Sequence, residues 1–343
     1  MSDAQPAQAT EIAAAVRQVL GDSLGYLYPA ALRVALRNDI ADHLTDGPKT
    51  AQQLAELTGV HGPFLHRVLR FLATRGMFRE DQTSAFHLTP AAHVLRTDTP
   101  YSVRSTALLF TDEMYWQSAG RLEDTVRDGS TVFNDIFGAP LFDYIQGEGE
   151  RERLFSDAMD TMSMTEQSGI VASYDFPETG TVIDLAGGLG GFLRTLLTRN
   201  PGLHGVLFER ESVLQRHTLD DAAIEGRWKT AVGDFFEAVP PGADFYVLKR
   251  IVHDKSDADS LRILRTVRGA MTERSRLLIV DAVRPHVDIS PSVTISDVLM
   301  LTVFEGRERT EQELEELLAA ADLKSLKVIS TPGTLSIVEV APV

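Results

Sequence analysis

The chain has 343 residues, of which 43% are hydrophobic, and its formal net charge is −16. This charge argues against a broad surface for nucleic acid or anionic membrane, because phosphate binding requires clustered Lys and Arg. The sequence has no cysteine, which excludes disulfides and thiolate metal sites. Its apolar runs are too short to span a membrane and its first residues do not resemble a signal peptide, so we expect a cytoplasmic globular protein of two or three domains.

The N-terminal part of the chain has the pattern of helices followed by a β-hairpin. Thr50 is a suitable cap for one helix, Gly59 marks a turn after it, and Pro63 begins another helix. Two short segments, 77–80 and 84–88, then have the composition of paired strands. Helix, turn, helix and hairpin together predict a winged helix.

A winged helix raises the alternative of a DNA-binding transcription regulator. Within residues 1–105, however, ten Lys or Arg residues stand against ten Asp or Glu residues. DNA readout needs a basic face, which this balance does not provide. We therefore favour a winged helix used for dimer packing over one that binds DNA.

The next segment is acidic and rich in aromatic and methionine side chains. Residues 106–166 contain thirteen Asp or Glu and four Lys or Arg. The spacing of Phe155, Met159 and Met162 predicts that all three lie on one helical face. Ordinary core packing is the default interpretation. The alternative is the wall of an apolar pocket for a flat ligand, to which Phe110 and Trp116 would also belong.

From about residue 173, predicted strands alternate with predicted helices. The expected strands cover residues 181–185, 205–208, 229–232, 243–248 and 277–280, followed by a closing hairpin over 325–330 and 334–340. The expected helices cover residues 191–200, 213–222, 256–271 and 310–321. Repeated βα units predict an α/β fold, in which a doubly wound, mostly parallel sheet carries helices on both faces. Ligands of such sheets bind at the carboxyl ends of the strands.

The residues that follow these strands have the chemistry of a nucleotide-type cofactor site. A glycine-rich turn follows the first strand, and there a ligand can approach the backbone and the N–H groups of a helix N-terminus. Glu209 ends the second strand and suits a ribose diol, while the acid and aromatics after the third strand suit an adenine. We expect the cofactor site to be formed by Asp184, Gly187, Gly188, Gly190, Glu209, Gly233, Asp234, Phe235, Lys249 and Arg250.

These features resemble the S-adenosylmethionine (SAM)-dependent small-molecule O-methyltransferases of the plant caffeate/chalcone type and their bacterial natural-product relatives. The motifs that carry the resemblance span nearly the whole chain and lie at residues 50–78, 137–144, 155–159, 186–191, 248–254 and 306–310. The resemblance implies a Rossmann-like class I methyltransferase domain with a seven-stranded sheet, and an N-terminal winged-helix domain that forms a homodimer. It divides the chain into a dimerisation domain (1–105), a helical linker lining the substrate pocket (106–172) and a SAM-binding catalytic domain (173–343).

The resemblance also implies which residues carry the chemistry. It puts the general base on His253 and the two acids that orient this base on Asp281 and Glu308. The residue types agree, because a phenol is mostly protonated at neutral pH and needs a base, and a carboxylate fixes the tautomer of a histidine. A pocket residue falls on Met300, and we expect Asp254 and Phe304 to contact the substrate as well.

His253 is singled out by its position among nine histidines. It alone follows a predicted strand at the carboxyl edge of the sheet. The others are expected on the surface or in helices, and they are His43, His61, His66, His87, His93, His204, His217 and His286.

Three positions depart from the family pattern. Ala186 replaces the first glycine of the turn, and its methyl group is tolerable only if the backbone there avoids positive φ. Lys255 stands where the family usually has an aromatic residue after His-Asp, which removes a flat surface for the adenine. Arg210 and Glu211 replace the usual Leu-Pro.

The leading prediction is a SAM-dependent O-methyltransferase that acts on a phenolic or polyketide-like hydroxyl in secondary metabolism, such as antibiotic biosynthesis. It would release S-adenosylhomocysteine (SAH). The alternatives are an N-methyltransferase, a SAM-binding hydroxylase, decarboxylase or pericyclase that transfers no methyl group, and more remotely a transcription regulator. We expect a small aromatic substrate and a homodimer, without a metal ion, nucleic acid or membrane as partner.

Overall fold

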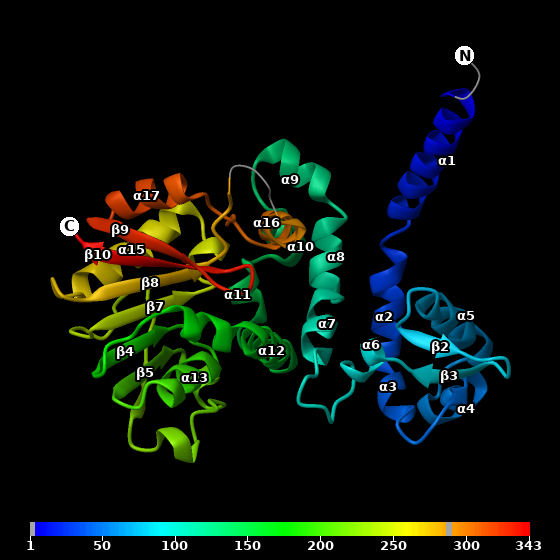
Figure 1. The fold of residues 1–343 in the computed structure, drawn as a ribbon, viewed down its shortest axis with the longest axis horizontal. Helices are drawn as coiled ribbons and strands as arrows, with labels where there is room; N and C mark the ends of the chain where they lie inside the picture. The colour runs from blue at the N-terminus through cyan, green and yellow to red at the C-terminus, as the bar shows by residue number, and fades with distance from the viewer. Residues whose placement is uncertain (1–3, 286–289) are drawn as a thin grey trace. The chain divides into compact units, whose positions relative to one another are not determined.

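The computed structural model describes residues 4–285 and 290–343 (Figure 1). His286, expected on the surface or in a helix, lies outside the described residues. The chain forms two compact units, residues 1–112 and 113–343, which we describe separately as the N-terminal and C-terminal units. The domain boundaries expected at 105 and 172 stay a prediction.

The N-terminal unit consists of helices and a small antiparallel sheet. Its helices are α1 (Ala4–Ser23), α2 (Leu27–Arg37), α3 (Ile40–His43), α4 (Ala51–Thr58), α5 (Gly62–Ala73), α6 (Pro90–His93) and α7 (Arg104–Phe110). Its strands, in the order β1-β3-β2, are β1 (Lys49–Thr50), β2 (Phe78–Glu80) and β3 (Ala85–Leu88). The predicted order of helix, turn, helix and hairpin is confirmed. Strand β1 was not predicted, because a strand of only two residues leaves no recognisable pattern in the sequence.

Local signals explain where these helices begin and end. The side chain of Thr50 accepts a hydrogen bond from the backbone of Gln53, whose side chain accepts one from the backbone of Thr50, so α4 begins with a capping box. Gly59 ends the helix with a φ of 75°, and Pro63 lies in the first turn of α5. Leu54 of α4 and Leu69 of α5 are both buried in the core of this unit.

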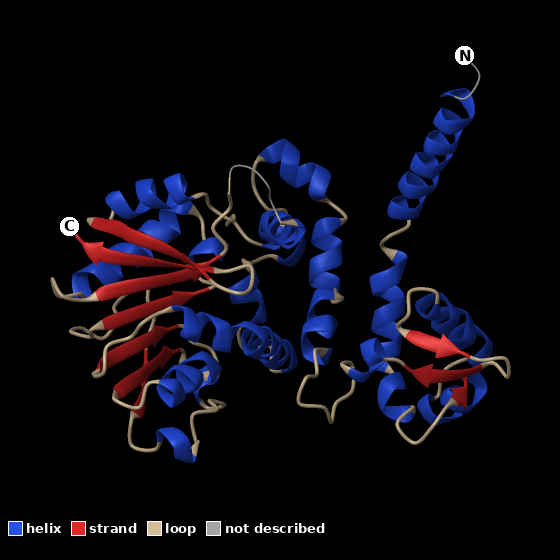
Figure 2. Cartoon of the chain, viewed as in Figure 1, coloured by secondary structure: helices blue, strands red, loops and turns tan. Residues whose placement is uncertain are grey.

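The C-terminal unit is built around a seven-stranded sheet (Figure 2). The strands are β4 (Gly180–Leu185), β5 (Leu203–Glu209), β6 (Trp228–Val232), β7 (Phe245–Lys249), β8 (Arg276–Asp281), β9 (Leu323–Ser330) and β10 (Ser336–Pro342), in the order β6-β5-β4-β7-β8-β10-β9. Strands β4 to β8 pair in parallel, and β10 is antiparallel to both β8 and β9. The chain runs outward from β4 to β6 and returns through β7 on the other side of β4, which is the switch point where such sheets bind ligands.

Helices cover both faces of this sheet, as predicted. The long helices are α12 (Glu150–Ser173), α13 (Gly191–Arg199), α15 (Asp257–Ala270), α16 (Pro291–Val303) and α17 (Glu311–Ala319). Shorter ones are α8 (Glu113–Ala119), α9 (Leu122–Asp128), α10 (Phe133–Phe137), α11 (Leu141–Ile145), α14 (Glu211–Leu214), and the 3-10 helices η1 (Ala222–Ile224) and η2 (Val252–Asp254). Buried residues of α12 and α13 form one core with the sheet, and buried residues of α15 and α17 form another. Within the described parts of the chain, no helix combines the length and the apolar character that a membrane span requires.

One predicted helix is wrong. Residues 213–222 were expected to be helical, but α14 ends at Leu214 and η1 begins only at Ala222. Between them, Thr218 donates its backbone N–H to the carbonyl of Leu189 (2.8 Å), and the buried side chain of Leu219 packs beside Gly190. Tertiary contacts with the glycine turn therefore override the helical pattern of this segment.

Candidate functional site

The glycine turn between β4 and α13 is too crowded for side chains at the positions that approach the sheet. A Cβ atom on Gly187 would lie 2.4 Å from Oδ2 of Asp184 and 2.7 Å from a methyl carbon of Leu207. Gly188 and Gly190 have φ angles of 59° and 87°, which side chains disfavour. The turn therefore presents bare backbone at the N-terminus of α13, where N–H groups are available to a ligand.

The expectation for Ala186 is wrong. We expected its backbone to avoid positive φ, but its φ is 53°. This left-handed conformation costs about 1 kcal/mol for alanine. The backbone N–H of Ala186 donates to the carbonyl of Phe208 (2.8 Å), a tie to the neighbouring strand β5 that holds the strained turn in place.

Two carboxylates, one half-buried and one buried, flank this turn. Glu209 accepts hydrogen bonds from the backbone N–H groups of Gly188 (3.3 Å) and Arg210 (2.8 Å), one on each oxygen. Asp184 is 1% exposed, and within the described residues its Oδ2 has no hydrogen-bond partner. Burial raises the pKa of Glu209 and raises that of Asp184 to about 7. Both acids retain acceptor capacity for a donor group of a bound molecule.

The loop after β6 lies next to Glu209. The backbone N–H of Gly233 donates to the carbonyl of Glu209 (3.2 Å), and a Cβ on Gly233 would lie 2.4 Å from the ring of Phe208. Asp234 is exposed and accepts a hydrogen bond from the backbone of Phe236 (2.8 Å), while the rings of Phe235 and Phe236 lie 5.0 Å apart. The loop thus offers an acid and aromatic surface beside the carboxyl end of β5.

Lys249 and Arg250 at the end of β7 both pair with one acid of α12. Glu166 forms two hydrogen bonds with Arg250 (3.0 and 2.8 Å) and lies 3.5 Å from Nζ of Lys249. Burial lowers the pKa of Lys249. Arg250 has a φ of 57°, an uncommon conformation for a residue with a side chain. Its guanidinium was expected at the cofactor site. In the structure it pairs with Glu166, and both side chains form part of the wall of a hollow.

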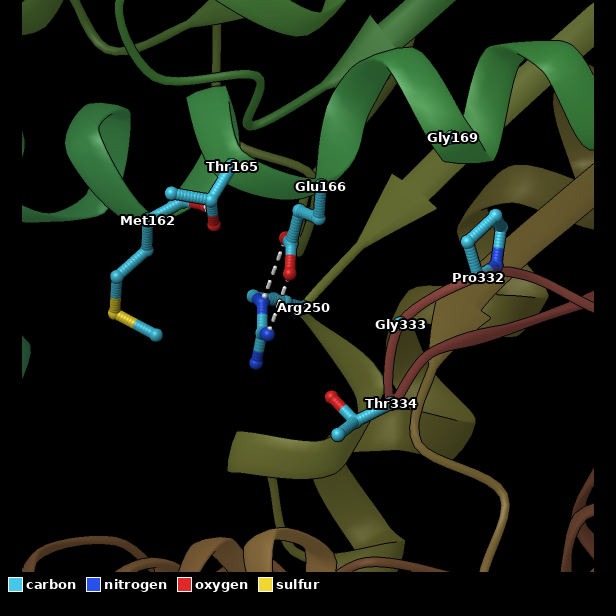
Figure 3. Close-up of a pocket in the computed structure, with 8 residues that line it drawn as sticks. All are labelled: Met162, Thr165, Glu166, Gly169, Arg250, Pro332, Gly333 and Thr334. Carbon is cyan, nitrogen blue, oxygen red and sulfur yellow. Dashed lines mark hydrogen bonds and ion pairs between the residues drawn. The ribbon is translucent and has the colours of Figure 1, made fainter. Parts of the chain in front are cut away.

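That hollow has a volume of about 500 Å³ and opens between α12 and the turn before β10 (Figure 3). Its wall is formed by Met162, Thr165, Glu166, Gly169, Arg250, Pro332, Gly333 and Thr334. Figure 3 shows the paired side chains of Glu166 and Arg250 between Met162 on one side and Thr334 on the other. One predicted substrate residue, Met162, therefore lines a real hollow.

His253 lies on η2, directly after β7, and the structure brings it together with both predicted acids. Its side chain is buried, and Nδ1 lies 3.0 Å from Oε1 of Glu308. Its backbone N–H donates to Oδ2 of Asp281 (3.2 Å), so Asp281 contacts the peptide of His253 and Glu308 contacts the ring. Glu308 is held in turn by the hydroxyl of Ser296 (2.5 Å).

The charges around this imidazole favour its protonated form. Burial alone would lower the pKa of His253, but the negative charges of Asp281 and Glu308 outweigh burial and raise it. Burial would likewise raise the pKa of Glu308, but the hydrogen bond with His253 holds that pKa below its usual range. Because Nδ1–H donates to Glu308, Nε2 carries the lone pair of the neutral ring and is the atom that can accept a proton.

The predicted substrate residues are brought together in part. The ring of Phe142 lies 5.7 Å from those of both Phe155 and Phe304. The ammonium of Lys255 lies 3.9 Å from the centre of the Phe142 ring and 2.9 Å from Oδ1 of Asp254. An aromatic cluster thus adjoins the His-Asp segment through Lys255.

The other predicted substrate residues are placed as follows. Met300 is buried on α16, Met159 is half-buried on α12, and Trp116 is 61% exposed on α8. Phe110 ends α7 in the N-terminal unit. The described contacts within the C-terminal unit do not test the roles of these four residues, which stay predictions.

Known protein families match both units. The model of the O-methyltransferase domain matches residues 119–324, and that of the O-methyltransferase dimerisation domain matches residues 22–98. The chain belongs to the O-methyltransferase family. Phenazine O-methyltransferase PhzM of Lysobacter antibioticus is 36% identical over 321 residues, which are 93% of this chain and 94% of that protein.

Two solved structures extend this similarity to the fold and the cofactor. CalO1, a methyltransferase of calicheamicin biosynthesis in its SAH-bound form, is 41% identical, with a TM-score of 0.81 and 100% of both chains covered. NcsB1, an O-methyltransferase from neocarzinostatin biosynthesis in complex with SAH and 1,4-dihydroxy-2-naphthoic acid, is 31% identical, with a TM-score of 0.79 and 92% and 96% of the two chains covered. The predicted family, class I fold and SAM cofactor are confirmed, and this chain is a SAM-dependent O-methyltransferase with a dimerisation domain.

Four residues of this O-methyltransferase site were not predicted. Glu166 and Ser296 lie on helices whose sequences show no signal for the contacts they make. Gly306 and Arg309 belong to the segment 306–310 that carried part of the resemblance, but no role was assigned to them. Only the fold brings Glu166 to the end of β7, Ser296 to Glu308, and Gly306 and Arg309 to the backbone of η2.

Proposed function

We propose that this enzyme methylates a phenolic hydroxyl of a flat, polyketide-like natural product, with His253 as the general base. The observation that carries the proposal is the buried imidazole, whose Nδ1 is bound to Glu308 and whose Nε2 is left as proton acceptor. It lies after β7, and the glycine turn lies after the adjacent parallel strand β4, at the same edge of the sheet. The names of PhzM and NcsB1, which give a phenazine and a naphthoic acid, support an aromatic acceptor.

The residues around the glycine turn fit SAM. We assign Glu209 to the ribose diol, since each of its oxygens accepts only one hydrogen bond from a backbone N–H. Asp234 and Phe235 are assigned to the adenine. The buried Oδ2 of Asp184, which has no hydrogen-bond partner in the part of the chain that the structure describes, fits a donor group of the cofactor. When bound, SAM supplies an electrophilic methyl group and leaves as SAH.

The residues of the enzyme then have two tasks. The phenol O–H donates its proton to Nε2 of His253, which leaves the oxygen electron-rich for attack on the methyl carbon. Glu308 and Asp281 stabilise the imidazolium that forms, as carboxylates beside a catalytic histidine do. We assign the aromatic cluster of Phe142, Phe155 and Phe304 to the wall that orients the flat acceptor.

Turnover with a panel of acceptors tests this function. The full-length enzyme is incubated with SAM labelled on its methyl group and with hydroxyphenazines, dihydroxynaphthoic acids and aromatic amines. We expect labelled methyl ethers and an equal amount of SAH. Product formed without SAH would favour the non-methylating alternative, and methylation of the amines alone would favour an N-methyltransferase.

Glu209→Gln tests the ribose assignment. The variant keeps the shape of the side chain but removes its charge, and a hydrogen bond to a charged group contributes about 1.5–3 kcal/mol. We expect SAH to bind roughly 10- to 100-fold more weakly in calorimetry. Glu211→Gln, an exposed position on α14, is the control and should leave the affinity unchanged. An unchanged affinity in Glu209→Gln would mean that Glu209 does not bind the ribose.

We further propose that the dimerisation domain forms a homodimer in which α1 is covered by the partner. Large apolar side chains on this helix are exposed within the single chain, namely Ile12, Val16, Val19 and Leu20. Exposed apolar stripes of this kind mark interaction surfaces. Light scattering should give twice the 37.7 kDa of one chain, and a change of Val16 and Leu20 to Asp should shift it to the monomer mass.

A further inference from the structure

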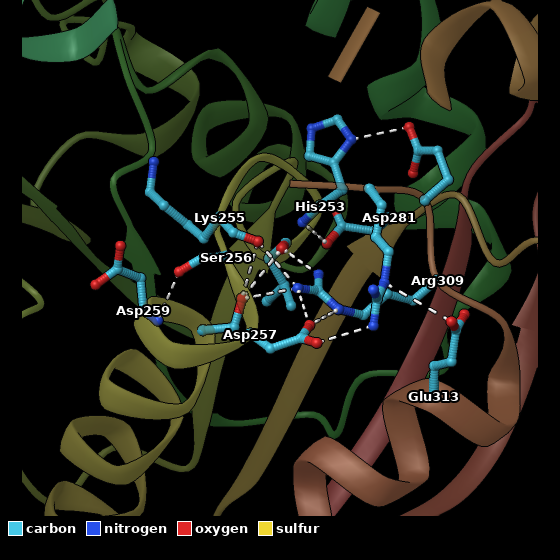
Figure 4. A network of polar contacts seen from close by, with 12 residues as sticks. His253, Lys255, Ser256, Asp257, Asp259, Asp281, Arg309 and Glu313 are labelled. Atoms are coloured by element: carbon cyan, nitrogen blue, oxygen red, sulfur yellow. Dashed lines mark hydrogen bonds and ion pairs between the residues drawn. The ribbon is translucent and has the colours of Figure 1, made fainter. Parts of the chain in front are cut away.

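Arg309 is a buried cation at the base-bearing loop that the proposed mechanism does not use. It directly follows Glu308, and only 3% of it is exposed. Its guanidinium donates to the carbonyl of Val252 (2.5 Å) through Nη1 and to that of Lys255 (2.9 Å) through Nη2. Figure 4 shows this guanidinium beneath the segment that carries His253. The two carbonyls lie on either side of His253 in the chain.

The other hydrogen bonds to the backbone of this loop are longer. The backbone N–H of His253 donates to Asp281 (3.2 Å), and the hydroxyl of Ser260 lies 3.3 Å from the carbonyl of Val252 and 3.5 Å from that of Lys255. Helix η2 is only three residues long, and its closing bond from the backbone N–H of Lys255 to the carbonyl of Val252 is stretched to 3.4 Å. Donation from a guanidinium is about twice as strong as a neutral hydrogen bond, and its fork fixes two acceptors relative to each other. Arg309 is therefore the strongest donor to the backbone of this loop among the described contacts.

Asp257 orients the guanidinium. Its Oδ1 accepts from Nε (3.1 Å) and Nη2 (2.8 Å) of Arg309, so the fork cannot rotate away from the loop. The other oxygen of Asp257 accepts from Nη2 of Arg307 (2.8 Å), a half-exposed residue for which no contact with the two carbonyls is found in the described structure. Arg307 thus contacts the same acid, Asp257, without a described contact to the two carbonyls of the loop, which makes it a matched control.

We propose that Arg309 is a positioning residue that fixes the backbone on both sides of His253, so that its ring meets Glu308 in one orientation. The inference rests on the proposed function in that His253 is the base. Glu308 and Arg309 are neighbours in sequence, so one extended segment holds the ring and the main chain of the base together. A loss of Arg309 leaves the ring free to turn from Glu308 without removing any group that reacts.

The test compares full-length Arg309→Met, Arg309→Lys and Arg307→Met with the wild type. Turnover is measured with SAM and the best acceptor of the panel, and SAH affinity is measured by calorimetry. The titration of His253 is followed by NMR of 15N-histidine-labelled protein, and the His253→Asn variant assigns its signal. For Arg309→Met we expect kcat to fall roughly 10- to 100-fold, as for a misplaced catalytic group, with SAH affinity unchanged. The His253 signal should show mixed tautomers and a pKa nearer its ordinary value.

The remaining variants separate positioning from a general loss of structure. Arg309→Lys keeps a cation that reaches one carbonyl and should recover part of both kcat and the titration shift, while Arg307→Met should match the wild type. The proposal is overturned if Arg309→Met keeps the kcat and titration of the wild type, or if Arg307→Met is equally impaired. Should Arg309→Met not fold, an Arg309→Lys enzyme with wild-type titration and kcat would overturn it as well. If the wild type methylates no acceptor, the proposed function fails, while the NMR titration still decides the role of Arg309.

Discussion

His253→Ala is expected to lower kcat for methyl transfer by about 10²- to 10⁴-fold, which is the usual contribution of a positioned general base. The affinity for SAH should not change, because the described contacts of the imidazole lie with Glu308 and not with the glycine turn. Initial rates and calorimetry on the same preparation measure both quantities. His204→Ala, an exposed histidine on β5, is the control and should retain full activity. A His253→Ala enzyme with wild-type kcat would remove the imidazole from the reaction.

The pH dependence of the same reaction gives a second view of this base. The active form is the neutral ring, and the carboxylates raise the pKa of His253 above its ordinary value of about 6.5. We therefore expect kcat/KM to rise with pH through an inflection above that value. Glu308→Gln removes one of these charges, so the inflection in kcat/KM should move to lower pH. The value of kcat/KM at high pH should also fall, because the carboxylate no longer fixes the tautomer of His253.

The contribution of His253 to the stability of the fold should fall as pH rises, whereas kcat/KM should rise. A raised pKa means that the folded state binds the proton more tightly than the unfolded state. The contribution of the His253–Glu308 ion pair to folding is therefore fully present below the unfolded pKa and is lost as pH rises through the folded pKa. The enzyme gains activity over the pH range in which this pair ceases to stabilise the fold.

Sequence pattern was sufficient wherever local chemistry decides the structure. Alternating apolar segments located the seven strands, and the rule that ligands lie at the carboxyl ends of parallel strands brought Asp184 and His253 to one edge of the sheet. The capping signal of Thr50 was also local, and this residue forms a capping box. Thr310, at the start of the helix expected over 310–321, forms a second capping box that was not predicted. Glu308, which is distant in sequence from His253, was reached only through the family resemblance.

The features that the sequence could not predict depend on tertiary contacts. Residues 215–221 have a helical composition, but they form a turn and an irregular segment instead, and a hydrogen bond from Thr218 to Leu189 holds this segment beside the glycine turn. Ala186 keeps a strained φ because β5 holds its N–H. Glu166 was missed because a carboxylate on an amphipathic helix gives no sign that it will face two cations from a strand end. Such contacts are set by the packing of distant elements and leave no mark in a local pattern.

Gly306→Ala is expected to lower kcat roughly 100-fold, although Gly306 bears no reacting group. A Cβ atom at this position would lie 2.1 Å from the carbonyl oxygen of His253 and 2.6 Å from the carbonyl carbon of Asp254. Both are backbone atoms, so no flexible side chain can move aside, and either η2 or the segment around residue 306 must shift. The same overlap should lower the free energy of unfolding by about 1–3 kcal/mol, as overpacking usually does.

The backbone of Gly306 does not need positive φ, so a loss in the variant reports the steric overlap and not backbone strain. Gly269→Ala on α15 is the matched control, because a Cβ there meets no atom within 4 Å. It should keep full activity and gain up to about 1 kcal/mol of stability, since alanine favours helix interiors over glycine. Initial rates and urea unfolding on the two variants distinguish the outcomes. If Gly306→Ala unfolds at lower urea concentration but retains wild-type kcat, the close approach of this segment serves packing alone, and the position of His253 does not depend on it.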